Sequence, residues 1–187
     1  MSATLVLIAI TCATSLVALR SPKMLESLLL WTRGVQRGEW YRLVTYGFVH
    51  ADFGHLLFNM VTLYFFGGVL DGFYAEHLGP LGFYIFYVAA LVASILPSYF
   101  DHRQEPDYRS LGASGAVSAV LFAFILFDPW STLLIFFVPM PAIVYAVAYV
   151  AYSIYASRQE GSRVNHSAHL WGAAFGIAFT LVLEPRL

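Results

Sequence analysis

Six apolar segments, each close to the length of a helix that crosses a membrane, constrain this chain more than any other feature. They cover residues 3–19, 55–70 with a backward extension over 44–49, 81–100, 111–127, 132–156 and 168–183. A spanning helix needs about 20 apolar residues, within a range of roughly 17 to 25. Most connections between the segments are too short for a separate domain. The sequence therefore predicts an all-α membrane protein in which residues 1–187 form a single domain.

Composition agrees with this prediction and excludes other classes. Apolar residues make up 59% of the chain and charged residues 11%, whereas soluble proteins carry roughly 25% charged residues. The formal net charge of −1 gives no reason to expect a nucleic-acid partner. The lone cysteine, Cys12, has no partner for a disulfide. No cation precedes the first apolar run, and Arg20 follows it, so we expect a retained first helix and not a cleaved signal peptide.

The segment between the first two apolar runs, residues 20–52, is too polar to cross lipid but is rich in leucine, tryptophan and arginine. Aromatic rings mixed with arginines suit the headgroup level of a bilayer. A disordered loop is the alternative, but it would leave a large apolar surface in water. We expect an interfacial loop with short helices between the first and second membrane helices.

Two of the six segments differ from an ordinary spanning helix. Residues 132–156 are too long for one straight span and include Pro139 and Pro141. Proline inside a helix removes a hydrogen bond and clashes with the preceding turn, so we expect the fifth helix to run from near Pro141 to Ser157. Residues 111–127 give a helix of roughly 25 Å, which is shorter than the roughly 30 Å of hydrocarbon. We therefore expect the preceding loop to dip inward and place Ser114 in a cavity below the membrane surface.

Few polar side chains accompany these apolar segments. They are His50, His55 and Asn59 around the start of the second, Ser114 and Ser118 in the fourth, and His166 and His169 around the start of the sixth. Taken singly, each has a plain structural explanation. A serine in a membrane helix often bonds its own backbone or lets helices approach, and a histidine or asparagine can hold two helices together. Polar groups in a bilayer are nevertheless expensive and usually face a bundle interior or a wet cavity.

Taken together, these side chains are what acyl transfer requires. Ser114 lies between glycines in Gly112-Ala113-Ser114-Gly115, and its hydroxyl needs a base, for which His169 is the best-placed candidate. His55 and Asn59 share a helix face at i and i+4 and could donate hydrogen bonds to an oxyanion. The aspartates fall at segment ends or in loops. We therefore expect a Ser–His dyad without the carboxylate of a triad.

Small residues follow both members of the predicted dyad. Gly172 and Gly176 follow the histidine at i+3 and i+7, and Gly115, Ala119 and Ala123 follow the serine at helical spacing. Small residues at such spacing let two helix backbones approach closely. The serine and the histidine could then come within hydrogen-bond reach.

With these residues in order, the chain resembles the rhomboid intramembrane serine proteases over nearly its whole length. The matching elements are Trp40-Tyr41-Arg42, His50-x4-His55-x3-Asn59, Gly67-Gly68, Gly112-Ala113-Ser114-Gly115 and Ala168-His169-x2-Gly172-x3-Gly176. A single G-x-S-G motif has low specificity. Five elements in this order and at these spacings have high specificity.

The resemblance implies the minimal bacterial rhomboid fold, a bundle of six transmembrane helices that cleaves transmembrane segments of other membrane proteins. Substrate would enter sideways from the lipid bilayer, between the second and fifth spans, and no metal or cofactor would take part. By resemblance, Ser114 is the nucleophile, His169 is the general base, and His55 and Asn59 stabilise the oxyanion with the backbone N–H of the serine. The structural positions near the site are Arg42, His50, Gly112, Gly115, Gly172 and Gly176. The expected location is the bacterial inner membrane.

One departure from the family concerns the base. Some members carry a tyrosine four residues after the nucleophile, stacked on the general base, whereas this chain has Ser118 there. Trp171 and Phe175 are neighbours of His169 in the sequence but are expected to point away from its face. The packing that orients the base must therefore come from elsewhere.

Membrane orientation is the second departure. If the spans alternate, the loops on the Ser114 side hold nine cations, and the opposite side holds only Arg186. The nine are Arg20, Lys23, Arg33, Arg37, Arg42, Arg103, Arg109, Arg158 and Arg163. The positive-inside rule would place that side in the cytoplasm, whereas the resemblance implies a cytoplasmic N-terminus and a site that opens outward. We favour the family orientation, because arginines of an interfacial loop are expected to be partly structural.

Two other functions fit parts of the sequence. A rhomboid-like protein that binds membrane helices without cutting them should lack a dyad residue, and this chain has both. A metal or proton transporter could use His50, His55, His166 and His169, because histidine pairs bind zinc. No intramembrane carboxylate or cysteine joins those histidines, and the transporter hypothesis does not explain the glycine-flanked serine.

Overall fold

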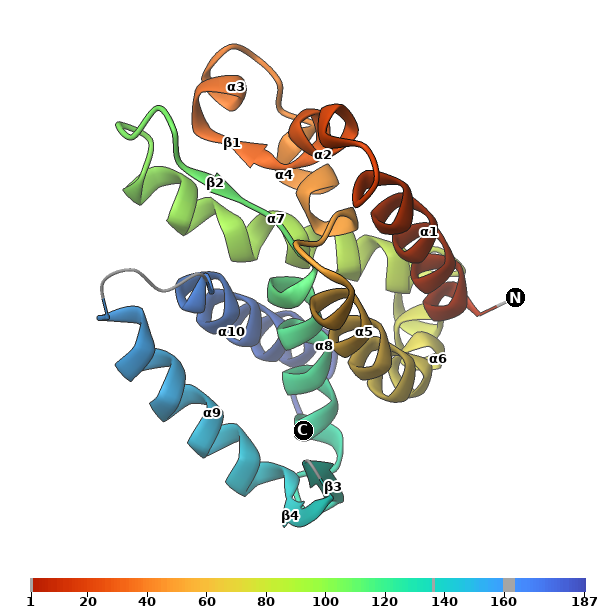
Figure 1. Cartoon of the computed structure of the whole chain (residues 1–187). Helices are drawn as coiled ribbons and strands as arrows, with labels where there is room; N and C mark the ends of the chain where they lie inside the picture. Colours follow the sequence, from red (N-terminus) through yellow and green to blue (C-terminus); the bar gives the residue numbers. More distant parts are fainter. Residues whose placement is uncertain (1, 136, 160–163) are drawn as a thin grey trace.

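Helices form most of the computed structural model, which describes residues 2–135, 137–159 and 164–187 (Figure 1). The longer elements are α1 (Ala3–Ala18), α5 (Phe53–Thr62), which continues through the π-helical turn η2 (Leu63–Gly67) into α6 (Gly68–Leu78), α7 (Gly82–Asp101), α8 (Ser114–Phe127), α9 (Ala142–Ser157) and α10 (His166–Leu183). The shorter helices are α2 (Pro22–Leu28), α3 (Thr32–Gln36), α4 (Arg42–Thr45) and η1 (Tyr46–Phe48). A helix therefore covers most of each of the six apolar segments.

The second apolar helix begins later and ends later than the sequence predicted. Residues 44–49 do not extend it backward, because they belong to α4, to η1 and to the turn that follows. The helix begins after Asp52, whose side chain accepts the backbone N–H of His55 at 2.8 Å. Such a cap satisfies a donor that the first helical turn leaves free. From there the helix continues through η2 to Leu78.

The expected break in residues 132–156 is confirmed. The antiparallel strands β3 (Thr132–Ile135) and β4 (Val138–Pro141) precede α9, and Pro141 is the residue that caps it. The fourth helix is shorter than predicted, because α8 begins at Ser114 and not at Leu111. Its 14 residues correspond to about 21 Å.

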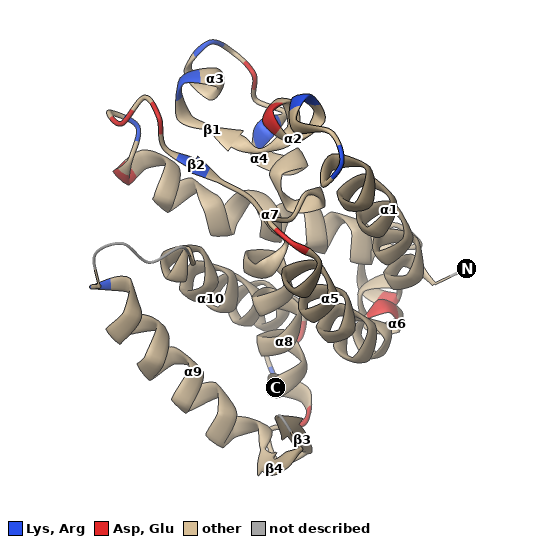
Figure 2. Cartoon of the chain, in the orientation of Figure 1, with Lys and Arg blue, Asp and Glu red and all other residues tan. Residues whose placement is uncertain are grey.

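Among the described residues, three helices are long and apolar enough to cross a membrane: Phe53–Leu78, Gly82–Asp101 and His166–Leu183. Three shorter apolar helices accompany them: Ala3–Ala18, Ser114–Phe127 and Ala142–Ser157. Figure 2 shows the charged residues mainly in the connections and at helix ends, with the densest group around α2, α3 and β2. The long helices present apolar side chains, as a lipid-embedded bundle requires.

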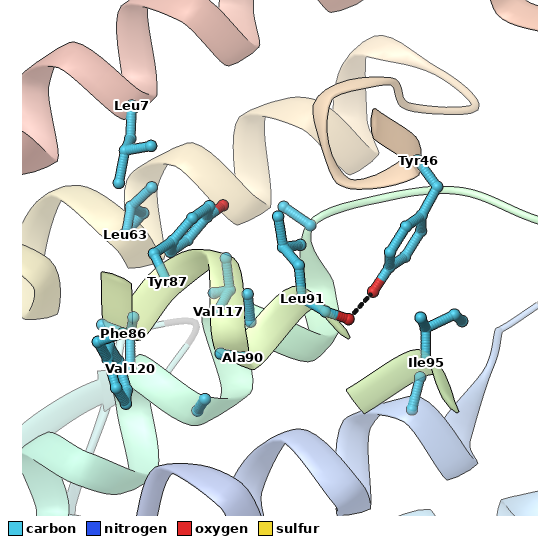
Figure 3. Close-up of a cluster of buried hydrophobic side chains, with 14 of the residues drawn as sticks. Leu7, Tyr46, Leu63, Phe86, Tyr87, Ala90, Leu91, Ile95, Val117 and Val120 are labelled. Atoms are coloured by element: carbon cyan, nitrogen blue, oxygen red, sulfur yellow. Dashed lines mark hydrogen bonds between the residues drawn. The ribbon is translucent and has the colours of Figure 1, made fainter. Parts of the chain in front are cut away.

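The interior of the molecule is built on α7, which lies against the first loop, α8 and α10. Phe86, Tyr87 and Leu91 are fully buried in its centre, beside Val117 and Val120 of α8 (Figure 3). The Tyr46 hydroxyl donates to the Leu91 carbonyl oxygen at 2.8 Å, as Figure 3 shows. This bond ties the segment just before α5 to the central helix.

The first loop is folded and is joined to the segment that leads into α8. Arg42 is 5% exposed, and its guanidinium donates to the carbonyl oxygens of Glu26 and Leu29 and to the Glu39 carboxylate. Strand β1 (Leu30–Trp31) pairs antiparallel with β2 (Arg109–Ser110). A disordered first loop is therefore excluded, and the loop holds the approach to Ser114.

Candidate active site

The backbones of α8 and α10 are in direct contact, and this contact brings the two residues of the predicted dyad close together. A Cβ added at Gly172 would lie 2.0 Å from the carbonyl oxygen of Gly115, and one at Gly176 would lie 2.2 Å from that of Ala119. Real Cβ atoms are not found so close to backbone atoms. The glycines of α10 are therefore required for this packing, and the close approach expected from the small residues is present.

Ser114 and His169 meet across this contact. The Ser114 Oγ lies 2.7 Å from the His169 Nε2. When the imidazole carries its proton on Nδ1, the serine hydroxyl donates to Nε2, which is the geometry that a general base needs. Ser114 is the first residue of α8, and His169 lies in the first turns of α10. Both side chains therefore stand at the same end of two tightly packed helices.

Asn165 fixes the start of α10. Its Oδ1 accepts the backbone N–H of Ala168 at 2.9 Å and the hydroxyl of Ser98 at 3.1 Å. Its Nδ2 donates to the Tyr108 hydroxyl at 3.0 Å, and the Tyr108 ring stacks on His102. The cap thus links the helix that carries His169 to α7 and to the loop before α8.

His50 holds the residue just before Ser114. The backbone N–H of Ala113 donates to its Nε2 at 3.3 Å, so the ring proton is on Nδ1, which donates to the Ser15 Oγ at 2.9 Å. The Ser15 hydroxyl in turn donates to the carbonyl oxygen of Phe48. Burial lowers the pKa of His50 to about 3, and the neighbouring His55 adds to the decrease, while Asp52 opposes it. His50 is therefore a neutral connector between α1 and the loop that leads to Ser114.

His55 packs against Gly112, two residues before the nucleophile. Gly112 has a φ of +112°, a conformation that side chains with a Cβ rarely adopt. A Cβ there would also lie 2.5 Å from the Cε1 atom of His55. Only glycine fits both the backbone and the ring, so this position explains the first glycine of the G-x-S-G motif.

Asn59 lies one turn further along α5 and is 2% exposed. Its Nδ2 donates to the carbonyl oxygen of His55 at 2.9 Å. An amide nitrogen carries two hydrogens, so one N–H remains available to another acceptor. The fold therefore places His55 at the loop before Ser114 and buries Asn59 beside it on α5.

Tyr149 of α9 is a site residue that the sequence did not reveal. Its hydroxyl lies 2.6 Å from the Ser118 Oγ, and its ring stacks on His169 with centroids 6.2 Å apart and planes inclined by 23°. Trp171 is exposed and Phe175 packs on Phe86, so neither faces the base, as expected. The sequence does contain an indication, because Tyr149 lies in a row with small residues on one face of α9.

The histidines form pairs and not a larger cluster. The rings of His50 and His55 are 4.9 Å apart, and those of His166 and His169 are 5.8 Å apart. Within the described part of the chain, no three His, Cys, Asp or Glu side chains gather as a metal site. The nine cations on the Ser114 side include Arg163, which lies outside the described residues.

Comparisons with known proteins agree on one family. A family profile described as "Rhomboid domain" matches residues 37–186. The chain is 31% identical over 176 residues to "RHOMBOID-like protein 12, mitochondrial" of Arabidopsis thaliana, covering 87% of this chain and 52% of that protein. It is 28% identical over 169 residues to "Putative rhomboid protease YdcA" of Bacillus subtilis, covering 86% and 79%. It is 33% identical over 136 residues to the human "Presenilin-associated rhomboid-like protein, mitochondrial", covering 70% and 34%. The chain thus spans about half the length of the plant relative.

Proposed function

Because this chain belongs to the rhomboid family, we propose that it is an intramembrane serine endopeptidase that cleaves transmembrane segments of other membrane proteins. The observation that carries the proposal is the 2.7 Å contact between the Ser114 hydroxyl and the His169 Nε2. A serine next to a base on rigid, closely packed helices is the arrangement that nucleophilic catalysis requires.

The proposed reaction is acyl transfer to the serine. The Ser114 Oγ attacks the carbonyl carbon of the scissile peptide while its proton moves to His169 Nε2. His55, Asn59 and the backbone N–H of Ser114 donate hydrogen bonds to the oxyanion of the tetrahedral intermediate. The imidazolium then gives its proton to the leaving amine. A water molecule, deprotonated by the same histidine, releases the acyl group and restores the serine.

The architecture that we propose is a single membrane domain over residues 1–187 with six spanning helices. The three shorter apolar helices then complete the bundle beside the three that are long enough by themselves. A bacterial inner membrane is the proposed location, and one bacterial relative is matched over 79% of its length. Substrate helices enter from the bilayer between α5 and α9. Pro141 lies at the start of α9 and not inside it, so it fixes one end of this proposed gate.

For orientation, we propose a cytoplasmic N-terminus and a site that opens to the opposite side. Arg42 is buried and binds two carbonyl oxygens, so at least one of the nine cations has a structural role, and Arg109 forms an exposed ion pair with Glu26 at 3.6 Å. Such a role weakens the positive-inside argument. The test is labelling of a cysteine introduced at the exposed Lys23 of the first loop by a membrane-impermeant thiol reagent in intact cells, in a Cys12→Ala background. Labelling only after the cells are opened would contradict this orientation.

The experiment that tests the activity uses the purified chain in detergent with a fluorophosphonate probe and a transmembrane substrate. We expect labelling and cleavage by the wild type, and a loss of about 1000-fold or more in Ser114→Ala and His169→Ala. Ser157→Ala, which alters an exposed serine, is the matched control and should keep wild-type rates. Cleavage that survives Ser114→Ala would exclude the mechanism. Capture of the substrate helix without cleavage would indicate a binding protein instead.

A further inference from the structure

Helix α9 places Tyr149 among small side chains on the face that it turns toward the bundle. Residues with small side chains, Ala142, Ala146, Ser153 and Ala156, are buried on this face. Tyr149 lies in the same row, since the spacing 142, 146, 149, 153, 156 follows one side of a helix. Tyr145 and Val150 also pack on this side, so the contact of α9 with its neighbours combines small residues with a few larger, partly buried ones.

The position of this tyrosine is fixed by α8. Its hydroxyl lies 2.6 Å from the Oγ of Ser118, which is one turn after Ser114 on α8. Its ring packs on Phe122, one further turn along, with centroids 5.5 Å apart. The neighbouring ring of Tyr145 lies 5.8 Å away on α9 itself. Tyr149 is therefore held at its hydroxyl and on its ring.

The same ring lies beside the imidazole of His169 and nearly parallel to it. The planes are inclined by only 23°, with centroids 6.2 Å apart, and on another side the His166 ring meets His169 edge-on at 5.8 Å. A dyad without a carboxylate needs another group to hold the base and to favour its protonated form. The face of an aromatic ring attracts a cation at about 6 Å. Tyr149 is placed to do both when the imidazole accepts the serine proton.

We propose that Tyr149, held by Ser118, is the positioning residue that orients His169, so that the dyad is complete only while α9 lies against α8. The inference rests on the proposed function, and it identifies a contact that governs the same site. It also assigns a role to Ser118, whose hydroxyl holds the hydroxyl of Tyr149. A displacement of α9 would remove the ring from His169 and would leave the α8–α10 contact unchanged.

The test measures two rates in purified variants: the fluorophosphonate labelling of Ser114, and kcat and KM for a transmembrane substrate. Tyr149→Leu should lower kcat and the labelling rate about 10-fold with KM within about 2-fold of wild type, since aromatic contacts of this kind have modest energies. Tyr149→Phe keeps the ring and should lose only about 3-fold. Ser118→Ala should lose the same amount, and the double variant Ser118→Ala/Tyr149→Phe should be no worse than either single one.

Tyr155→Leu is the matched control, because it removes the same atoms from the exposed side of the same helix. It should keep kcat within about 2-fold of wild type. Equal effects of Tyr155→Leu and Tyr149→Leu, or a wild-type kcat in Tyr149→Leu, would overturn the inference. If Tyr149→Leu does not fold, Ser118→Ala serves as the test instead. An unchanged kcat in Ser118→Ala would then overturn the inference.

The two proposals fail in different ways. A wild-type chain that is not labelled at Ser114 contradicts the proposed function. A wild type that is labelled and cleaves, together with Tyr149→Leu at wild-type rates, leaves the protease intact and contradicts only the role of Tyr149.

Discussion

Helices α9 and α10 both pack on α8, but they do so in different ways. Helix α10 meets α8 through Gly172 and Gly176, where no side chain separates the two backbones. Helix α9 meets its neighbours through small side chains and through partly buried residues such as Tyr149, and its opposite face is exposed. Backbone contact tolerates little displacement, because the interior is closely packed. The proposed nucleophile and base therefore lie on the pair of helices in backbone contact, and the tyrosine that we propose as the positioning residue lies on the helix held by side chains alone.

The largest expected effect comes from breaking the rigid contact. Gly172→Leu must displace α10 from α8, because its Cβ would overlap the Gly115 carbonyl. We expect a loss of at least about 3 kcal/mol in unfolding free energy and a fall of more than about 100-fold in fluorophosphonate labelling. Thermal unfolding in detergent and labelling rates measure the two effects. Gly72→Leu is the control, since a Cβ there meets nothing within 4 Å, and equal losses in both variants would contradict the contrast.

The second effect concerns His50, which links α1 to the loop that leads into α8. Its pKa is lowered from 6.5 to about 3 by burial, so between these values the unfolded chain binds a proton that the folded chain does not. Stability should therefore fall as pH falls below about 6.5, by up to about 1.4 kcal/mol for each pH unit. Unfolding measured between pH 7.5 and 5 should show this slope. His50→Gln should reduce the slope by the contribution of one histidine, whereas His77→Gln, at an exposed position, should leave it unchanged; an unchanged slope in His50→Gln would refute the assignment.

Added bulk on α9 should cost less than added bulk on α10. Ala146 is buried on the inner face of α9, and Ala146→Leu should push α9 outward at a cost of about 1 to 3 kcal/mol. Because Tyr149 moves with α9, kcat should fall about 10-fold while the chain still folds. Cleavage assays and thermal unfolding on the same preparations separate the loss of activity from the loss of stability. A loss of stability as large as that of Gly172→Leu would show that the two helices are equally rigid.

The smallest expected effect comes from removal of the Asn165 side chain that caps α10. Asn165→Ala removes the acceptor of the Ala168 N–H and the links to Ser98 and Tyr108. The expected loss is about 1 kcal/mol in unfolding free energy, with a lower kcat because the first turn carries His169. Ser21→Ala removes the cap of α2 and should lower stability without changing kcat. A Ser21→Ala variant with equally reduced kcat would mean that any lost cap slows the reaction.

The sequence predicted the helices and the close approach of α10 to α8, because local patterns mark both. Apolar segments near membrane length mark each long helix, and glycines at i+3 and i+7 mark the face of α10 that meets α8. It did not predict where the second helix begins, because residues 44–49 are as apolar as the helix that follows and are separated from it only in the folded chain, by short helices and the Asp52 cap. Tyr149 was missed because its contact with His169 joins residues 20 positions apart, on different helices.

Composition, spacing and motif order are local properties, and they are enough to predict the class of the protein and the residues that we propose for its chemistry. Which of these residues meet depends on the tertiary fold. It placed His169 2.7 Å from Ser114, set His55 against Gly112, and brought a tyrosine from α9 to the base. The physical reason is that these contacts follow from how whole helices approach one another, and two carbonyl oxygens of α8 need the space that the glycines of α10 leave.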